Sequence, residues 1–390
     1  MEMIYNNFDK LEITFKGKLP EKILEQLKEA KQKAQEAKTD YFTEIGKTKM
    51  SVKVSETGAK GGYAYRFDTG KGGEVWMAAQ TLRLDNWAIR VSVKSLALML
   101  YGYDGVIKRL MARLEALEAT GEGFTHKADK ETPYYVTSGL EERISRFDYC
   151  FDFRDDEKRL SPKPDLFLAH SNCKKRSHWD KSTVSASSVM KGDKIQTITL
   201  GSLPGRQATL YNKTKEITDK GGKHWWQQWQ MNPKKYKGII WRVEVRAGKD
   251  ELDKWNLKNF EDFNNKAGDV IISILQAMRY TEPNGDLNRS RWPTAGFWED
   301  ATNKANKALA PYISNAKREK VFSDNLAEKV QMYRRNILGN AIGLTAAEKR
   351  DLAELPAVLE SLNTDFENLA THNQEDLMEK FEQVEKRFNR

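Results

Sequence analysis

The segment 146–152 reads Arg146-Phe147-Asp148-Tyr149-Cys150-Phe151-Asp152 and runs on into Phe153. Polar or small residues alternate with aromatic ones. This period of two predicts a β-strand, because successive side chains of a strand point to opposite faces of the sheet. The aromatic face is expected to pack in a core. The other face carries a guanidinium, two carboxylates and a thiol, and we expect the thiol to be a small core residue.

The charged face of this strand has two interpretations. Two carboxylates on one face repel each other unless a cation lies between them. Arg146, Asp148 and Asp152 therefore indicate either a solvated face that pairs with Lys or Arg on a neighbouring strand, or a metal site. The segment alone does not separate the two.

A second segment brings a tyrosine next to a cation and an acid. The stretch Thr199–Ser202 followed by 208–216 predicts a strand, a turn, a second strand and the start of a helix. Tyr211 falls near the strand end, with Lys213 two residues on and Glu216 one helical turn later. A phenol with a pKa of about 10 is a poor nucleophile unless a cation stabilises the phenolate. The alternative is a half-buried packing tyrosine.

A third segment, 241–246, has the same alternation. Arg242, Glu244 and Arg246 share one strand face, while Val243 and Val245 point to the core. Such a face forms either a cross-strand ion network or a phosphate-handling site, in which guanidinium groups hold the phosphate and the carboxylate binds a metal.

Elsewhere in the chain the same kinds of pattern recur. Strands are expected at 11–16, 87–93, 144–153, 195–200, 207–212 and 239–245, and helices at 20–38, 106–117 and 213–220, the last ended by Gly221-Gly222. A polar run over 120–132 is expected to be a linker. After Lys249 helical periodicity dominates, over 256–280, 294–312, 320–338 and 345–390. Thr345 and Glu348 are expected to form a capping box at the start of the last helix.

These elements predict an α+β protein in three parts. A strand-rich unit with helices appears twice, which suggests an internal duplication. The expected boundaries are an N-terminal α+β half over 1–125, a catalytic α+β half over 135–250, and a helical C-terminal region over 251–390. The helical region is expected to dock a partner or to clamp DNA.

The charge balance favours a polyanionic partner. Of 390 residues, 65 are Lys or Arg and 56 are Asp or Glu, so the net charge is +9, and such a balance points first to nucleic acid. The longest apolar runs, such as 270–275, are too short to span a bilayer, and no membrane partner is expected. Two cysteines form neither a zinc quartet nor a disulfide framework, so a cytoplasmic setting is expected.

Four motifs together resemble a known family. They are Asp9–Phe15, then Arg146-x-Asp148-x-x-x-Asp152, then Tyr211-Asn-Lys-x-x-Glu216, then Trp241-Arg-x-Glu-x-Arg246, in that order. In this arrangement the chain resembles the replication initiation factor family, which includes initiators of rolling-circle plasmids and relaxases of integrative conjugative elements. The resemblance spans roughly residues 5–300, and no single motif carries it alone.

The resemblance implies a nicking enzyme. One DNA strand is cut at an origin, at a single-stranded or cruciform site, by attack of a tyrosine that stays linked to the 5′-phosphate. Residue by residue, it implies Tyr211 as nucleophile and Lys213 as its local cation. Asp148, Asp152, Glu216 and Glu244 are the implied candidate acids for Mg²⁺ or Mn²⁺.

The resemblance also implies the fold, the phosphate contacts and the partners. The two halves are expected to be alike and to resemble the TATA-binding protein. Arg146, Arg242 and Arg246 are candidate phosphate contacts. Many members of the family carry an Arg just before the motif tyrosine, whereas Thr209 and Leu210 stand here; Arg206 is the candidate replacement. A host helicase and a second copy of the chain are further candidate partners.

Aromatic and basic residues elsewhere suggest DNA contacts. Trp225 and Trp226 precede a lysine-rich stretch, and Lys174 and Lys175 lie in a basic loop. Exposed rings stack on unpaired bases, and lysines hold phosphates. The alternative is that the tryptophans are core anchors and the loop is merely basic.

The sequence lacks motifs that several rival functions require. No histidine pair of the His-x-His type and no His-x-x-Arg box occurs, so two-histidine relaxases and tyrosine recombinases are disfavoured. No phosphate-binding Gly-Lys-Ser/Thr loop occurs, so helicase activity must come from a partner. A non-catalytic origin-binding initiator or repressor remains the main alternative. An RNA-binding module has no specific motif in its support.

Overall fold

The computed structural model describes residues 1–70, 73–121, 140–169, 186–191, 194–222, 224–316, 318–374, 377–379 and 381. The chain separates into two compact units, Met1–Ala316 and Lys317–Arg390. Residues 251–316 of the expected C-terminal helical region therefore belong to the first unit, together with both expected α+β halves. The expected linker over 120–132 lies almost wholly outside the described residues.

A large antiparallel sheet organises the first unit. Its eleven strands follow the order β2-β3-β4-β5-β6-β1-β7-β12-β11-β10-β9. Their bounds are β1 Glu2–Lys16, β2 Tyr41–Ile45, β3 Met50–Val54, β4 Tyr65–Asp68, β5 Glu74–Ala78, β6 Ile89–Lys94, β7 Glu141–Asp155, β9 Ala186–Lys191, β10 Lys194–Gly201, β11 Arg206–Asn212 and β12 Ile239–Gly248. A separate two-stranded sheet joins β8 (Phe167–Ala169) to β13 (Met278–Tyr280). The described fold is therefore α+β, as the sequence predicts.

The sheet consists of two sets of strands, β1–β6 and β7 with β9–β12, which meet at the long central strands β1 and β7. The strands of the two sets pair in the same order. β1 pairs with β6, the last strand of its set, and β6 pairs with β5. In the same way β7 pairs with β12, and β12 pairs with β11. The first strand of each set thus lies at the centre of the sheet, next to the first strand of the other.

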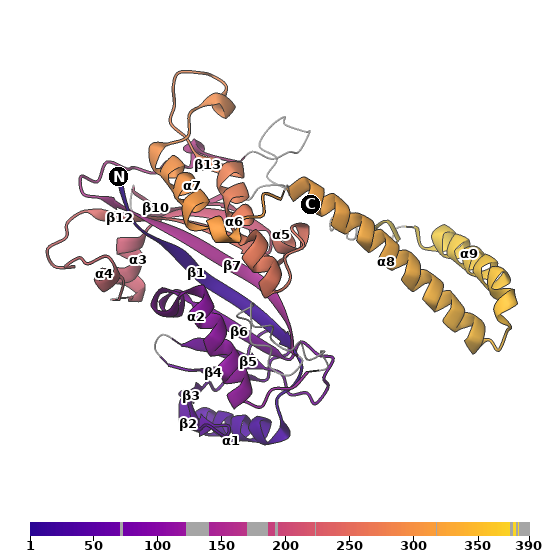
Figure 1. Ribbon diagram of the computed structural model, residues 1–390. Coiled ribbons are helices and arrows are strands. Elements are labelled where there is room, and N and C mark those ends of the chain that lie inside the picture. The colour runs from indigo at the N-terminus through magenta and orange to yellow at the C-terminus, as the bar shows by residue number, and fades with distance from the viewer. Residues whose placement is uncertain are drawn as a thin grey trace. The chain divides into compact units, whose positions relative to one another are not determined.

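Helices of the first unit pack mainly on one face of the sheet (Figure 1). Buried side chains of α1, α2, α5, α6 and α7 share one core cluster with the sheet. The helix bounds are α1 Glu21–Ala37, α2 Ser95–Ala116, α3 Lys213–Lys220, α4 His224–Gln228, α5 Lys249–Lys254, α6 Phe260–Ala277 and α7 Gly296–Ala308. α3 has the bounds expected from sequence, and α2 bends at Gly102 (φ 65°), a few residues before the helix expected over 106–117.

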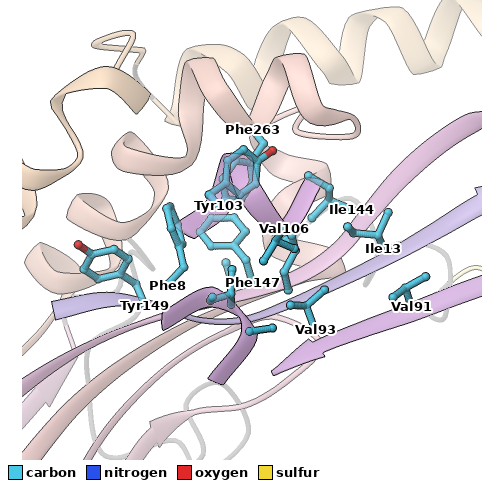
Figure 2. Close-up of a cluster of buried hydrophobic side chains, with 14 of the residues drawn as sticks. Phe8, Ile13, Val91, Val93, Tyr103, Val106, Ile144, Phe147, Tyr149 and Phe263 are labelled. Atoms are coloured by element: carbon cyan, nitrogen blue, oxygen red, sulfur yellow. The ribbon is translucent and has the colours of Figure 1, made fainter. Parts of the chain in front are cut away.

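Stacked and edge-on aromatic rings join the two strand sets. Tyr103 of α2 stacks on Phe263 of α6 with ring centroids 4.5 Å apart, and both rings lie above Phe8 and Phe147 of the central strands (Figure 2). Such pairs stabilise a core by about 0.5–1.5 kcal/mol beyond their buried area. The aromatic face of β7 is therefore the core face, as the alternation over 146–153 predicts.

A second, smaller hydrophobic cluster lies apart from this core. It joins α3 and α4 to β12 through Ile217, Trp225, Trp226, Trp229 and Ile240. Ile240 alternates with Trp241 and Val243 along β12, and those two belong to the main core. α3 and α4 consequently cover the opposite face of the sheet at this end.

The second unit is a helical hairpin. α8 (Arg318–Ala347) runs without a break through 339–344, the segment between the helices expected over 320–338 and 345–390, and α9 (Leu355–His372) follows a short 3₁₀ turn. The capping box predicted at Thr345 is wrong: the Thr345 hydroxyl donates to the Ala341 carbonyl oxygen inside α8. The box lies six residues later, where Asp351 caps the turn reciprocally with Glu354.

None of the described helices combines the length and the apolar character needed to cross a bilayer.

Candidate active site

Three neighbouring strands bring the predicted site residues to one face of the sheet. Tyr211 of β11 pairs with Arg242 of β12, and Arg242 pairs in turn with Asp152 of β7. Directly cross-strand residues point to the same side, so all three side chains lie on the face away from the main core. α3 begins immediately after β11 and places Lys213 and Glu216 beside them.

The Tyr211 hydroxyl lies between a carboxylate and a cation. It donates a hydrogen bond to Glu244 Oε2 at 2.8 Å, and Lys213 Nζ lies 3.5 Å from the Tyr211 hydroxyl oxygen. Lys213 Nζ also binds Glu216 Oε2 at 2.6 Å. The side chain of Asn212 caps α3 by accepting from the Lys215 amide, which fixes the turn that carries Lys213 next to the tyrosine.

Arg246 connects this group to a second pair. Arg246 Nε donates to Glu244 Oε1 at 2.7 Å and lies 3.9 Å from Asp148 Oδ2. Asp148 accepts two hydrogen bonds from the Arg146 guanidinium, at 2.8 and 2.6 Å. The residues predicted from three separate segments thus form one continuous network of contacts.

Arg242 forms the buried base of the site. Its side chain is 0% exposed and donates to both oxygens of Asp152, at 2.6 and 2.8 Å. A third bond of 2.8 Å reaches Asp9, which stands where β1 skips one residue in its pairing with β7. Trp229 Nε1 donates to Asp152 at 2.9 Å. The bulge explains how an N-terminal residue reaches a site built from β7, β11 and β12.

Burial and nearby charges shift the pKa values of Tyr211 and Glu244 in opposite directions. Burial and the neighbouring Glu244 carboxylate raise the pKa of Tyr211 well above its ordinary value, so the phenol is neutral. Burial also raises the pKa of Glu244, but Arg246 and Arg242 outweigh it and bring the pKa to about 2. The pair is therefore a neutral phenol hydrogen-bonded to an ionised carboxylate.

The tryptophans expected to stack on bases are buried instead. Trp225 and Trp226 are 3% and 9% exposed and belong to the hydrophobic cluster of α3 and α4. The Trp225 ring faces two cations, Arg242 at 4.1 Å and Lys213 at 4.9 Å. Cation–π contacts of this kind support the site from beneath, whereas a DNA base cannot reach a ring covered in this way. The core-anchor interpretation describes both side chains.

Two predicted phosphate contacts do not reach the site's surface. Arg242 is fully buried and already bonded to two carboxylates, so its role is internal. Arg206 lies five positions before Tyr211 on the same strand, and an odd separation places it on the opposite face. Arg146 and Arg246, 20% and 25% exposed, remain as guanidinium groups that face outward. Lys174 and Lys175 lie outside the described residues.

The four acids expected to bind a metal do not share one place. Asp152 is bonded to Arg242, Asp148 to Arg146, Glu244 to Arg246 and Glu216 to Lys213. In the parts of the chain that the structure describes, no group of three or more His, Cys, Asp or Glu side chains is placed to hold a metal ion. As arranged, these carboxylates fit an ion-pair network and do not fit a metal centre.

Three contributors were missed by the sequence patterns. Asp9 belongs to the first family motif but had no assigned role, because a one-residue bulge is invisible in the pattern. Trp229, which donates to Asp152, belongs to none of the four motifs and has no role assigned from sequence. Gln207 accepts from Arg246 at 2.7 Å. It lies two residues before Thr209 and four before Tyr211 on β11, so parity could have placed it on their face.

Comparison with known proteins adds little to this picture. No protein-family model matches the chain, and no curated protein does. A solved structure of the rolling circle replication initiator protein from Geobacillus stearothermophilus is similar to it, with 15% sequence identity and a TM-score of 0.40. The match covers 79% of this chain and 97% of that one. That protein is of the class that the sequence motifs resemble, but a likeness at this TM-score carries no argument about function.

Proposed function

We propose that this chain is a site-specific single-strand DNA endonuclease, a rolling-circle replication initiator or relaxase, that uses Tyr211 as its covalent nucleophile. One observation carries the proposal: the Tyr211 hydroxyl is held between an ionised carboxylate and an ammonium group. An activated nucleophile needs a hydrogen-bond acceptor for its proton and a cation for its developing charge. A packing tyrosine needs neither.

The proposed step is a transfer of one phosphodiester bond to the enzyme. The Tyr211 oxygen attacks the scissile phosphorus and passes its proton to Glu244. The bond from phosphorus to the 3′-oxygen breaks, and that oxygen leaves with the electron pair and takes up a proton from solvent water. The 5′-phosphate stays on the tyrosine. Arg146 and Arg246 face outward and offer guanidinium groups to the strand.

Glu244 is a weak base, and this shapes the mechanism. A carboxylate with a pKa of about 2 cannot deprotonate a resting phenol whose pKa lies above 10. Proton transfer must therefore accompany formation of the bond to phosphorus, when the phenolic proton becomes acidic. Lys213 stabilises the negative charge that appears on the tyrosine and phosphate oxygens at that moment.

The remaining parts of the proposal concern the metal, the fold and the partners. A requirement for Mg²⁺ or Mn²⁺ follows from the family resemblance, and we derive no step through it because the carboxylates are paired with cations. Nicking measured with either ion and with excess chelator tests it. We also propose that the two strand sets are related halves of the TATA-binding-protein kind, that origin DNA is the partner, and that a host helicase unwinds it in the cytoplasm.

The decisive experiment compares two tyrosine variants on supercoiled DNA that carries the origin of the encoding element. Tyr211→Phe is expected to bind this DNA but to form neither a nick nor a denaturant-stable protein–DNA adduct. Tyr149→Phe is the matched control, because Tyr149 is equally buried but hydrogen-bonded to Asn6 on the core face. Equal adduct formation by wild type and Tyr211→Phe would move the chemistry to another residue.

The second candidate function is a non-catalytic origin-binding initiator or repressor. The net charge of +9 suits DNA binding with or without chemistry. Tight, salt-dependent origin binding by the wild type, without nick or adduct under any metal condition, supports this function and overturns the enzymatic one.

A further inference from the structure

The sheet face beside Tyr211 is uncharged from the tyrosine towards the edge of the sheet. Tyr211 pairs with Thr197 of β10, and Thr197 pairs with Val189 of β9. Cross-strand partners point to the same side, so these side chains share one face. A second row of partners runs beside the first. Together the described neighbours of Tyr211 on this face of β9–β11, here called the uncharged strip, are Ser187, Val189, Thr197, Thr199, Gln207 and Thr209.

The uncharged strip is the open side of the site. Tyr211 is 8% exposed, Thr197 is partly exposed, and Val189 at the edge is 58% exposed. On the other side of Tyr211 the same row is covered, because Trp225 of α4 lies over Arg242 at 4.1 Å. A DNA strand that reaches the Tyr211 hydroxyl therefore has room over β10 and β9, and none over β12 along this row.

The outward-facing cations of the site lie along a different flank. Arg246 and Arg146 are partly exposed there. Gln207 marks the boundary, since its side-chain oxygen accepts from Arg246 Nε's neighbour Nη1 at 2.7 Å. Phosphates of a nucleic acid gather at guanidinium groups, whereas bases carry no charge and need hydrogen bonds or apolar contact. This division of charge orients a bound strand, with its backbone towards the arginines and its bases towards the uncharged strip.

The side chains of the strip are of the kind that distinguishes bases. Thr199 Oγ1 and Thr209 Oγ1 lie 3.4 Å apart. A hydroxyl has one donor and two acceptor positions, so this single contact leaves capacity on both groups. Ser and Thr hydroxyls bond to base edges, and the methyl groups of Thr and Val suit the methyl group of thymine.

We propose that the uncharged strip reads the identity of the unpaired bases next to the scissile phosphate. These bases lie on Thr197, Thr199 and Val189, while the strand's backbone follows Arg146 and Arg246. The strip thus selects where the strand is cut. The inference rests on the proposed function for the position of the scissile phosphate, and it adds the residues that determine the sequence of the nick site.

Binding followed by sequencing tests the proposal without any cleavage. Single strands of the origin, randomised in blocks of three bases, are bound to the full chain carrying Tyr211→Phe, and the bound fraction is sequenced. Adding Thr197→Val with Thr199→Val keeps the shape of both side chains. It should reduce the base preference at one block by about 2- to 10-fold for each hydroxyl removed.

Two neighbouring serines provide a milder variant and its matched control. Ser187 pairs with Thr199 on the strip, and Ser188 pairs with Ile198, so the two serines point to opposite faces. Ser187→Ala should lower the preference at the same block. Ser188→Ala removes the same hydroxyl group from the other face and should leave the preference unchanged.

Three results would overturn the proposal. They are a Tyr211→Phe chain without any base preference, a preference that the strip variants leave intact, and an equal loss of binding for every sequence, which would mean that the hydroxyls hold the backbone. Cleavage of the same pool by the chain with Tyr211 intact tests the endonuclease separately. A preference that the variants shift, without cleavage, removes the nucleophile and keeps the strip; cleavage with an unshifted preference does the reverse.

Discussion

Replacing Arg242 by Met tests the buried base of the site. Arg242 is 0% exposed and joins Asp152 and Asp9 through three hydrogen bonds of 2.6–2.8 Å. Removing one partner of a buried ion pair leaves an uncompensated charge and costs about 3–5 kcal/mol. Two carboxylates lose their cation here, and Asp152 keeps only the bond from Trp229. We therefore expect a loss near the upper end of that range.

Urea unfolding followed by tryptophan fluorescence measures this loss, and the transition of the first unit is the one to compare. Acidification should shrink the difference between Arg242→Met and wild type, because protonation removes the unpaired charges. Adding Asp152→Asn to Arg242→Met should recover part of the stability, since one buried charge disappears with its partner. A loss below about 1 kcal/mol at neutral pH, within the range of an exposed ion pair, would refute the reasoning.

Three smaller perturbations test other contacts. Lys213→Met should reduce nicking while origin binding persists, and Lys213→Arg should restore part of the rate; equal rates in all three chains would remove Lys213 from the mechanism. Burial raises the pKa of Asp148 to about 6, against 3.8 for a free side chain, so its ionisation costs stability as the pH rises through about 6. Asp148→Asn should therefore gain stability relative to wild type between about pH 4 and about pH 7 in urea unfolding, and a pH-independent difference would contradict this. Trp229→Phe removes the hydrogen bond to Asp152 and should cost about 1–3 kcal/mol in the same assay, whereas no change would mean that water replaces the indole.

Local patterns predicted much of the fold, because elements such as α1 and β6 have one buried face and one that is more exposed. The alternation over 146–153 and 241–246 gave both the strands and the direction of their core faces. α8 was harder, since a run containing Gly339 and Gly343 is typical of a turn. In the structure α8 continues through both glycines, although glycine has a low helix propensity.

The site was predictable in its residues but not in their roles. Strand parity correctly places Tyr211, Arg242 and Glu244 on one face. The pattern does not show how deeply a side chain is buried. Arg242 packs against the ring of Trp225 from α4, and only the tertiary structure shows that α3 and α4 cover that end of the face. For the same reason a face of acids and arginines that suggested a metal site is an ion network, in which each carboxylate already has its cation.

The matching pairing order of the two strand sets has a consequence for stoichiometry. β5 is the counterpart of β11 in the first set, since each lies one strand outward from the neighbour of the central strand. β5 has the sequence Glu74-Val-Trp-Met-Ala78 and no tyrosine, whereas β11 carries Tyr211. The first set therefore has no nucleophile on the strand that corresponds to β11. On the proposed mechanism each chain therefore holds one DNA end at a time, and holding two ends together takes two chains.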